Sequence, residues 1–130
     1  MDDEKLRGAL KRAVSRVNRA AAQRLAVQTK NGWKSIPIHT IYFCEVINRK
    51  IYLHTTDGVV DYYGKLEELE KRLDAGFYRC HRSYLVNLDR LSAYTNGWIT
   101  LENQEQVPVS RLRQKEFMEV MLHHLKSKKI

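Results

Sequence analysis

Turn dipeptides constrain the fold of this chain more than any other feature. Two of them, Asp57-Gly58 and Asn96-Gly97, each separate two short runs rich in branched and aromatic residues. Asp-Gly and Asn-Gly favour the tight turns that connect antiparallel strands. The sequence therefore predicts two β-hairpins, with strands near 50–55, 58–63, 91–94 and 98–101.

A third dipeptide, Asn31-Gly32, marks the point where helical periodicity gives way to a strand-like run over 33–43. Pro37 restricts that run to an edge strand or a strand start, because proline has no backbone N–H to donate. Further expected elements are strands at 84–88 and 106–109, a short helix at 66–73 and a terminal helix at 111–125. These patterns predict a mainly β fold of antiparallel strands with a few short helices.

The beginning of the chain has a different periodicity. Acidic residues at 2–4 come first, and apolar residues then recur every three or four positions, at Leu6, Leu10, Val14, Val17, Ala21 and Leu25. This pattern predicts an amphipathic helix. Its other face is basic, and it could contact lipid, pair as a short coiled coil or be solvated. We therefore expect a linker helix over 1–26 and a domain over 27–130.

The composition favours a polyanionic partner over catalysis. Lys and Arg number 23 against 15 Asp and Glu, which gives a formal net charge of +8. His123 and His124 are adjacent, so on a helix they point about 100° apart and cannot clamp one zinc ion. Ser83 lies near His81 without a nucleophile elbow, and no glycine-rich phosphate loop is present. We expect no enzymatic activity, no metal and no cofactor.

The two cysteines, Cys44 and Cys80, are too few and too far apart for a CxxC motif, and no signal peptide or long apolar run precedes them. We therefore expect a cytoplasmic protein. Cys80 lies between Arg79 and His81, whose charges could lower the thiol pKa and make Cys80 redox-sensitive. The alternative is a small strand residue that faces the core.

A basic stretch precedes an apolar strand within residues 77–90. We expect a loop over 79–83 in which Arg79 and Arg82 offer forked donors to phosphates or base edges. Two further basic segments could share a face with this loop. The candidate nucleic-acid contacts on the three segments are Asn48, Arg49 and Lys50, then Arg79, His81, Arg82 and Ser83, and finally Ser110, Arg111 and Arg113. The first segment could instead be an ordinary charged turn, and His81 could be a structural histidine.

The stretch Phe77-x-Arg79-x-His81-Arg82-Ser83-Tyr84-Leu85-Val86-Asn87-Leu88 resembles the core signature of LytTR domains, the DNA-binding output modules of many bacterial response regulators. Further motifs follow the family order: Ile41-Tyr42-x-x-Glu45, Tyr52-Leu53-His54-Thr55-x-Asp57-Gly58, Leu66-Glu67-x-Leu69-Glu70-x-x-Leu73 and Val107-Pro108-Val109-Ser110-Arg111. The resemblance covers roughly residues 27 to 125. Through Arg79-Cys80-His81 and Tyr63-Gly64-x-Leu66-x-Glu68-Leu69, the chain is similar to the accessory-gene-regulator type.

The resemblance implies an elongated antiparallel β fold that lays loops, rather than a recognition helix, into successive major grooves. Arg82 occupies the central base-contact position of the family, and Ser83 or His81 would fix the loop or hold a phosphate. The position two after Ser110, often a base-reading arginine in the family, is leucine here, so Arg111 or Arg113 would substitute. In the first loop we expect Arg49 to reach a base.

The resemblance also implies a function. The chain would be the sequence-specific DNA-binding output domain of a two-component response regulator that controls transcription at direct repeats in promoters. Its partners would be double-stranded DNA, a second protomer held through a receiver domain absent from this chain, and an upstream sensor histidine kinase, with no membrane. The alternative from another class is a basic module that binds an acidic protein or a membrane surface. RNA binding through exposed aromatic side chains is a third possibility.

Overall fold

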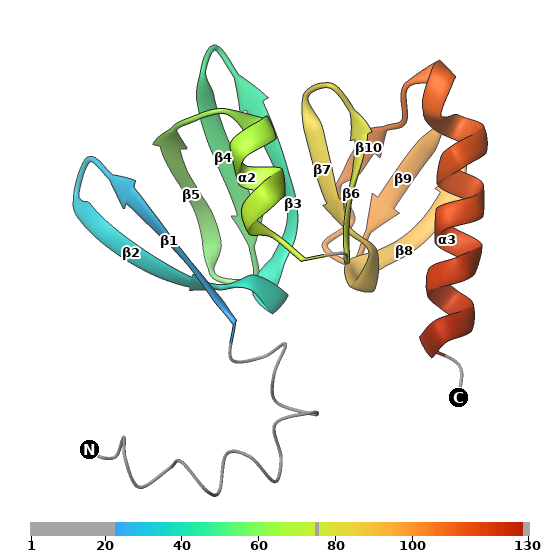
Figure 1. Cartoon of the computed structure of the whole chain (residues 1–130), viewed down its shortest axis with the longest axis horizontal. Helices are drawn as coiled ribbons and strands as arrows, with labels where there is room; N and C mark the ends of the chain where they lie inside the picture. Colours follow the sequence, from blue (N-terminus) through green and yellow to red (C-terminus); the bar gives the residue numbers. More distant parts are fainter. Residues whose placement is uncertain (1–22, 75, 129–130) are drawn as a thin grey trace, which may run out of the picture.

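The computed structural model describes residues 23–74 and 76–128, and within these ranges the chain forms ten strands, two α-helices and three short 3-10 helices (Figure 1). The strands are β1 (Arg24–Thr29), β2 (Gly32–Pro37), β3 (Ile41–Ile47), β4 (Lys50–Thr55), β5 (Gly58–Tyr63), β6 (Phe77–His81), β7 (Tyr84–Asn87), β8 (Leu91–Thr95), β9 (Trp98–Leu101) and β10 (Gln106–Pro108). The helices are η1 (Ile38–Thr40), α2 (Leu66–Arg72), η2 (Leu88–Arg90), η3 (Arg111–Arg113) and α3 (Gln114–Lys128).

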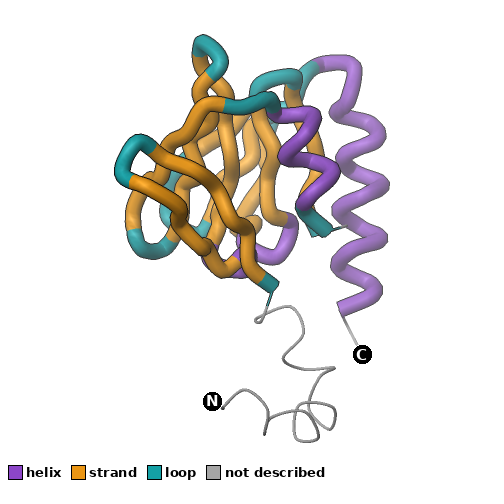
Figure 2. Tube along the Cα trace, turned by 60° about the vertical axis from the view of Figure 1, so that its left-hand side comes forward, coloured by secondary structure: helices purple, strands orange, loops and turns teal. Residues whose placement is uncertain are grey.

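The strands form three antiparallel sheets. The central sheet has five strands in the order β5-β4-β3-β7-β6, and β1-β2 and β10-β9-β8 form smaller sheets. Figure 2 shows that the strands make up the body of the domain and that α3 runs along one side. The mainly β, antiparallel fold expected from the sequence is thereby confirmed.

The glycines of the turn dipeptides explain why hairpins form where they do. Gly32, Gly58 and Gly97 have φ angles of +110°, +116° and +82°. L side chains rarely adopt this region, and glycine enters it without steric cost. The Asp57-Gly58 and Asn96-Gly97 turns connect β4 to β5 and β8 to β9, as predicted, and Asn31-Gly32 connects β1 to β2.

Two cores lie on opposite faces of the central sheet. On β3, Cys44 packs in a cluster with β1, β2 and α2, whereas its neighbour Phe43 packs in a second cluster with the β8–β10 sheet and α3. On β7, Leu85 and Val86 divide between the same two cores. Successive side chains of a strand point to opposite faces, so the middle of the sheet is buried on both sides.

Two of the predicted boundaries are wrong. The linker helix was expected to reach residue 26, but residues 24–26 belong to β1, because Leu25 and Val27 alternate into the core while the backbone pairs with β2. The rest of that helix, residues 1–22, lies outside the described residues. The basic loop expected over 79–83 is also shorter. Residues 79–81 belong to β6, so only Arg82 and Ser83 form the turn.

Asn87 is the only polar residue that is buried among those the structure describes. Its Nδ2 donates to the Ile41 carbonyl oxygen at 2.9 Å, and its Oδ1 accepts from the Asp89 backbone N–H at 2.9 Å. A buried polar group without a partner is costly, so the amide satisfies two backbone groups that the end of β7 would otherwise leave unpaired.

We predict that Asn87→Ala lowers the free energy of unfolding by about 2 kcal/mol, because it orphans a buried carbonyl and a backbone N–H. Asn103→Ala is the matched control. Asn103 makes a similar side-chain contact to the backbone N–H of Glu105, at 3.1 Å, in an exposed turn, and its loss should cost less than about 1 kcal/mol. Urea denaturation measures both values, and equal losses would contradict this account of Asn87.

Candidate nucleic-acid interface

Three basic segments lie along one edge of the domain, the upper edge in Figure 1. They are the β3–β4 turn at residues 48–49, the β6–β7 turn at residues 82–83, and residues 110–113 at the start of α3. Backbone hydrogen bonds join neighbouring segments. Val46 N donates to Ser83 O at 3.0 Å, and Ser110 N donates to Cys80 O at 2.9 Å. The structure therefore brings the three predicted segments together on one edge, as DNA reading by several loops requires.

The β3–β4 turn leaves the Arg49 side chain exposed, whereas the Lys50 side chain is held by neighbouring residues. Asn48 and Arg49 both have positive φ angles, 49° and 71°, as the tightest hairpin turns require. Arg49 is exposed and makes no ion pair among the described residues. Lys50 lies 3.0 Å from Asp61 and over the ring of Tyr63, and the bond to Asp61 raises its pKa. Arg49 is thus the open donor of this turn.

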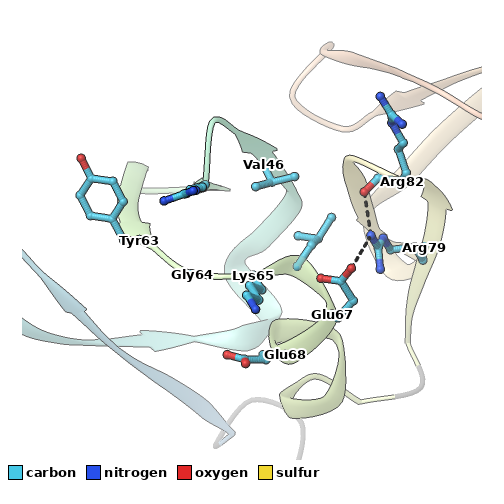
Figure 3. Close-up of a pocket in the computed structure, with 10 residues that line it drawn as sticks. Val46, Tyr63, Gly64, Lys65, Glu67, Glu68, Arg79 and Arg82 are labelled. Carbon is cyan, nitrogen blue, oxygen red and sulfur yellow. Dashed lines mark hydrogen bonds and ion pairs between the residues drawn. The ribbon is translucent and has the colours of Figure 1, made fainter.

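Arg79 supports the next turn from behind. Its guanidinium lies 3.3 Å from the carboxylate of Glu70, on α2. It also lies 3.9 Å from the carboxylate of Glu67 on the same helix, and its Nη2 donates to Arg82 O at 2.7 Å (Figure 3). The side chain is only 15% exposed. This geometry favours a positioning role, with Arg79 tying the β6–β7 turn to α2, over the predicted direct contact.

Arg82 is exposed at the tip of that turn, and Figure 3 shows its side chain extending away from Arg79. Behind it, His81 Nδ1 accepts from Ser83 N at 3.1 Å, which leaves its other ring nitrogen as the donor of a neutral imidazole. Burial, and then the charges of Arg82 and Arg79, lower the His81 pKa below 6.5. His81 is therefore neutral at pH 7, where it both shapes the turn and can donate one hydrogen bond.

The third segment begins with Ser110 and leads into α3. Arg113 Nη1 donates to Arg79 O at 2.8 Å, so this arginine fastens η3 to β6. Arg111 is exposed, and so is Leu112 at 94%. The start of a helix attracts anions through its unpaired N–H groups and its dipole. Of the two arginines proposed for this segment, the structure leaves Arg111 as the open one.

Cys80 does not have the surroundings of a reactive thiol. It is fully buried in the core beside α3, and its Sγ lies 3.5 Å from Pro108 O. Burial raises its pKa to about 12, the opposite of the direction that oxidation requires. The redox hypothesis is corrected accordingly, because burial outweighs the charges of the neighbouring basic residues. Burial also raises the pKa of the Cys44 thiol.

The described residues contain no cluster of three or more His, Cys, Asp or Glu side chains that could hold a metal ion. None of their helices has the length and apolar character needed to cross a membrane. A cleft of about 650 Å³ opens beside the first two turns, and both acidic and basic side chains line it.

Comparison with known proteins agrees with this geometry. The sequence model of the LytTr DNA-binding domain matches residues 31–122. The chain belongs to the LytTr DNA-binding domain family. A solved LytTr DNA-binding domain from Bacillus cereus superimposes with a TM-score of 0.67 at 27% identity, covering 75% of this chain and 95% of that one.

Two longer relatives share the LytTr sequence. The transcriptional regulatory protein YpdB of Escherichia coli K12 is 33% identical over 92 residues, which are 65% of this chain and 38% of YpdB. The sensory transduction protein LytT of Oceanobacillus iheyensis is 29% identical over 123 residues, which are 86% of this chain and 50% of LytT. The chain therefore spans at most half the length of these relatives.

The sequence analysis missed two features of the edge formed by the three basic segments. Lys65 lines the same cleft as Arg49 and Arg82 and adds another exposed cation there. In the sequence, Lys65 looks like any other lysine that precedes a helix, so no signal marked it as part of the site. The ion pairs from Glu67 and Glu70 to Arg79 were also missed. Their side chains do lie three residues apart on one helix face, but the partner strand is known only from the fold.

We predict that Glu70→Gln weakens DNA binding by the LytTr domain about threefold, because a partly exposed ion pair contributes under about 1 kcal/mol to holding the β6–β7 turn. Glu68→Gln, on the same helix without an ion pair to Arg79, should leave affinity unchanged or slightly higher, since it only removes a negative charge. Fluorescence anisotropy on one duplex measures both. Tighter binding by Glu70→Gln would show that Arg79 itself contacts DNA.

Proposed function

We propose that this LytTr domain reads double-stranded DNA through the edge formed by its three basic segments, as the output domain of a bacterial response regulator that controls transcription. The observation that supports this best is the placement of Arg49, Arg82 and Arg111. Each is exposed on a different segment of one edge, while backbone hydrogen bonds hold the segments in fixed relative positions. Forked donors on a rigid frame suit the edges of bases and the phosphates between them.

The three arginines differ in what they can do. Arg82 extends from the tip of its turn, and a bidentate contact to guanine would discriminate against other bases by about 1–3 kcal/mol. Arg111 lies at the start of α3, where the helix dipole favours a phosphate. We assign the third DNA contact to Arg49, on the β3–β4 turn. We propose that the turns enter successive major grooves, so that specificity depends on very few side chains.

In the full-length protein, a receiver domain would precede this one. Two protomers joined by their receivers would occupy direct repeats in a promoter, and a sensor histidine kinase would control that association. We also propose that the protein acts in the cytoplasm, where promoter DNA is found, and that it does so without catalysis or cofactor. The domain by itself would bind each half of the repeat independently.

We predict that Arg82→Ala removes most of the discrimination between a selected duplex and its scramble. The selected site would come from sequencing the duplexes that this chain retains from a random pool. Losing one bidentate contact should weaken cognate binding about tenfold or more and scrambled binding much less. Arg24→Ala is the matched control, because it removes one positive charge at the start of β1, where Arg24 contacts Ser35.

The salt dependence of binding separates this proposal from the rival of a merely basic surface. A cognate advantage that persists as salt rises supports base reading. If Arg82→Ala weakens cognate and scrambled duplexes equally, Arg82 contacts only phosphate. If no sequence is enriched at all, the domain is a nonspecific basic module and the proposal fails.

A further inference from the structure

Leu112 is an apolar side chain on the edge that we propose reads DNA. It is 94% exposed, the largest fraction among the exposed large hydrophobic residues within 23–74 and 76–128, whereas the exposed leucines of α3 reach only 53%. Leu112 belongs to neither of the two cores. Single exposed leucines are common on protein surfaces, so exposure alone assigns no role. The position and orientation of Leu112 do.

The short helix η3 sets the direction of the Leu112 side chain. A 3-10 helix has three residues per turn, so the three side chains of η3 point in directions about 120° apart. Arg113 turns toward the protein, because its Nη1 donates to Arg79 O at 2.8 Å. The other two, Arg111 and Leu112, are both exposed. The outer side of η3 therefore carries one cation and one apolar side chain next to each other.

Both ends of η3 are fastened to the rest of the domain. Before η3, Ser110 N donates to Cys80 O at 2.9 Å. After η3, the Gln114 side chain reaches back across it, and its Nε2 donates to Val109 O at 3.3 Å. Leu112 thus extends from a backbone that is already held in place, so a partner would not have to order this segment in order to contact it.

The major groove of DNA offers one apolar group to such a side chain. The phosphates are charged, and the base edges present hydrogen-bond donors and acceptors, except for the C5-methyl group of thymine. The Leu112 side chain has no donor or acceptor of its own. Of the groups that the groove displays, the thymine methyl is therefore the one that gains from contact with Leu112, through burial of apolar surface on both sides.

From these observations we infer that Leu112 is a specificity-determining residue that contacts the methyl group of a thymine in the major groove. The inference rests on the proposed function, because it requires the third basic segment to enter that groove. Arg111 binds a phosphate beside the same base pair. Leu112 then selects thymine over cytosine at one position of the site, by burying one methyl group rather than by a hydrogen bond.

Replacing single thymines by deoxyuridine in the selected duplex tests the inference. This change removes one methyl group and leaves every hydrogen-bonding group of the base pair in place. We expect deoxyuridine at one position to weaken binding of the parent chain about fourfold, the effect of one buried methyl-sized group. Leu112→Ala should weaken binding to the unmodified duplex by about fourfold or more, and deoxyuridine at that position should then cost nothing further. Fluorescence anisotropy at constant salt measures the four affinities.

Leu122→Ala is the matched control. It shortens another exposed leucine, which lies beyond the first two turns of α3 and away from the three basic segments. This variant should bind the unmodified duplex as the parent chain does, and it should still lose about fourfold in affinity at the same deoxyuridine position. Because Leu112 packs in neither core, Leu112→Ala should leave the fold intact, and a circular dichroism spectrum checks this.

The inference and the proposed function fail in different ways. If the random pool yields no selected duplex, the proposed function fails and the inference fails with it. If a site is selected but no thymine methyl in it matters, or if the methyl effect keeps its size in Leu112→Ala, only the inference is overturned. Equal weakening of the selected and scrambled duplexes by Leu112→Ala would also overturn it, because Leu112 would then contribute only general affinity.

Discussion

Strands β3 and β7 have no solvent-facing side over their central residues, and the rest of the domain is arranged around that constraint. Neighbouring residues in β3, Phe43 and Cys44, enter different cores, and Leu85 and Val86 do the same in β7. A slip of one residue would exchange every side chain between the two cores. The pairing register of the two strands is therefore fixed from both faces, and so are the positions at which these strands end.

Those strand ends carry two of the three basic segments that we propose read DNA. The β3–β4 turn follows β3, and the β6–β7 turn precedes β7, so a rigid pair of strands holds both turns. The third segment is fastened to them by Ser110 and Arg113. Several basic side chains at this edge are engaged with the protein. Lys50 pairs with Asp61, and Arg79 pairs with Glu70. The net charge therefore overstates how many cations DNA would meet, and under the proposed function the few open arginines would provide the specificity.

The sequence predicted the hairpins and the class of fold because those depend on local chemistry. Gly58 and Gly97 occupy conformations that few other residues accept, and the strands around them were placed within a residue or two. The three basic segments were also predicted, and the family resemblance singled out Arg82, but the supporting role of Arg79 was not predicted. Only the position of α2 shows that Arg79 is held by carboxylates while Arg82 extends outward.

The misplaced boundary at Leu25 has a related cause. A leucine four residues after Ala21 continues a helical stripe, and the same leucine two residues before Val27 begins a strand, so periodicity alone could not choose. Cys80 shows why the pKa of a thiol cannot be inferred from its charged sequence neighbours alone. Its sequence neighbours are basic, but its thiol is buried in the core beside α3, and that burial raises the thiol pKa. In both cases, tertiary packing decides which local pattern prevails.

Mapping the bound surface by NMR tests the central claim most directly. A ¹⁵N-labelled sample of this chain would be titrated with a selected duplex and with its scramble at the same salt concentration. We predict that the largest chemical-shift changes specific to the selected duplex fall at Arg49, Arg82 and Arg111 and their turns, with little change in β1, β2 or the exposed face of α3. Changes concentrated on β1 and β2, or equal for the two duplexes, would contradict the claim that this edge reads DNA.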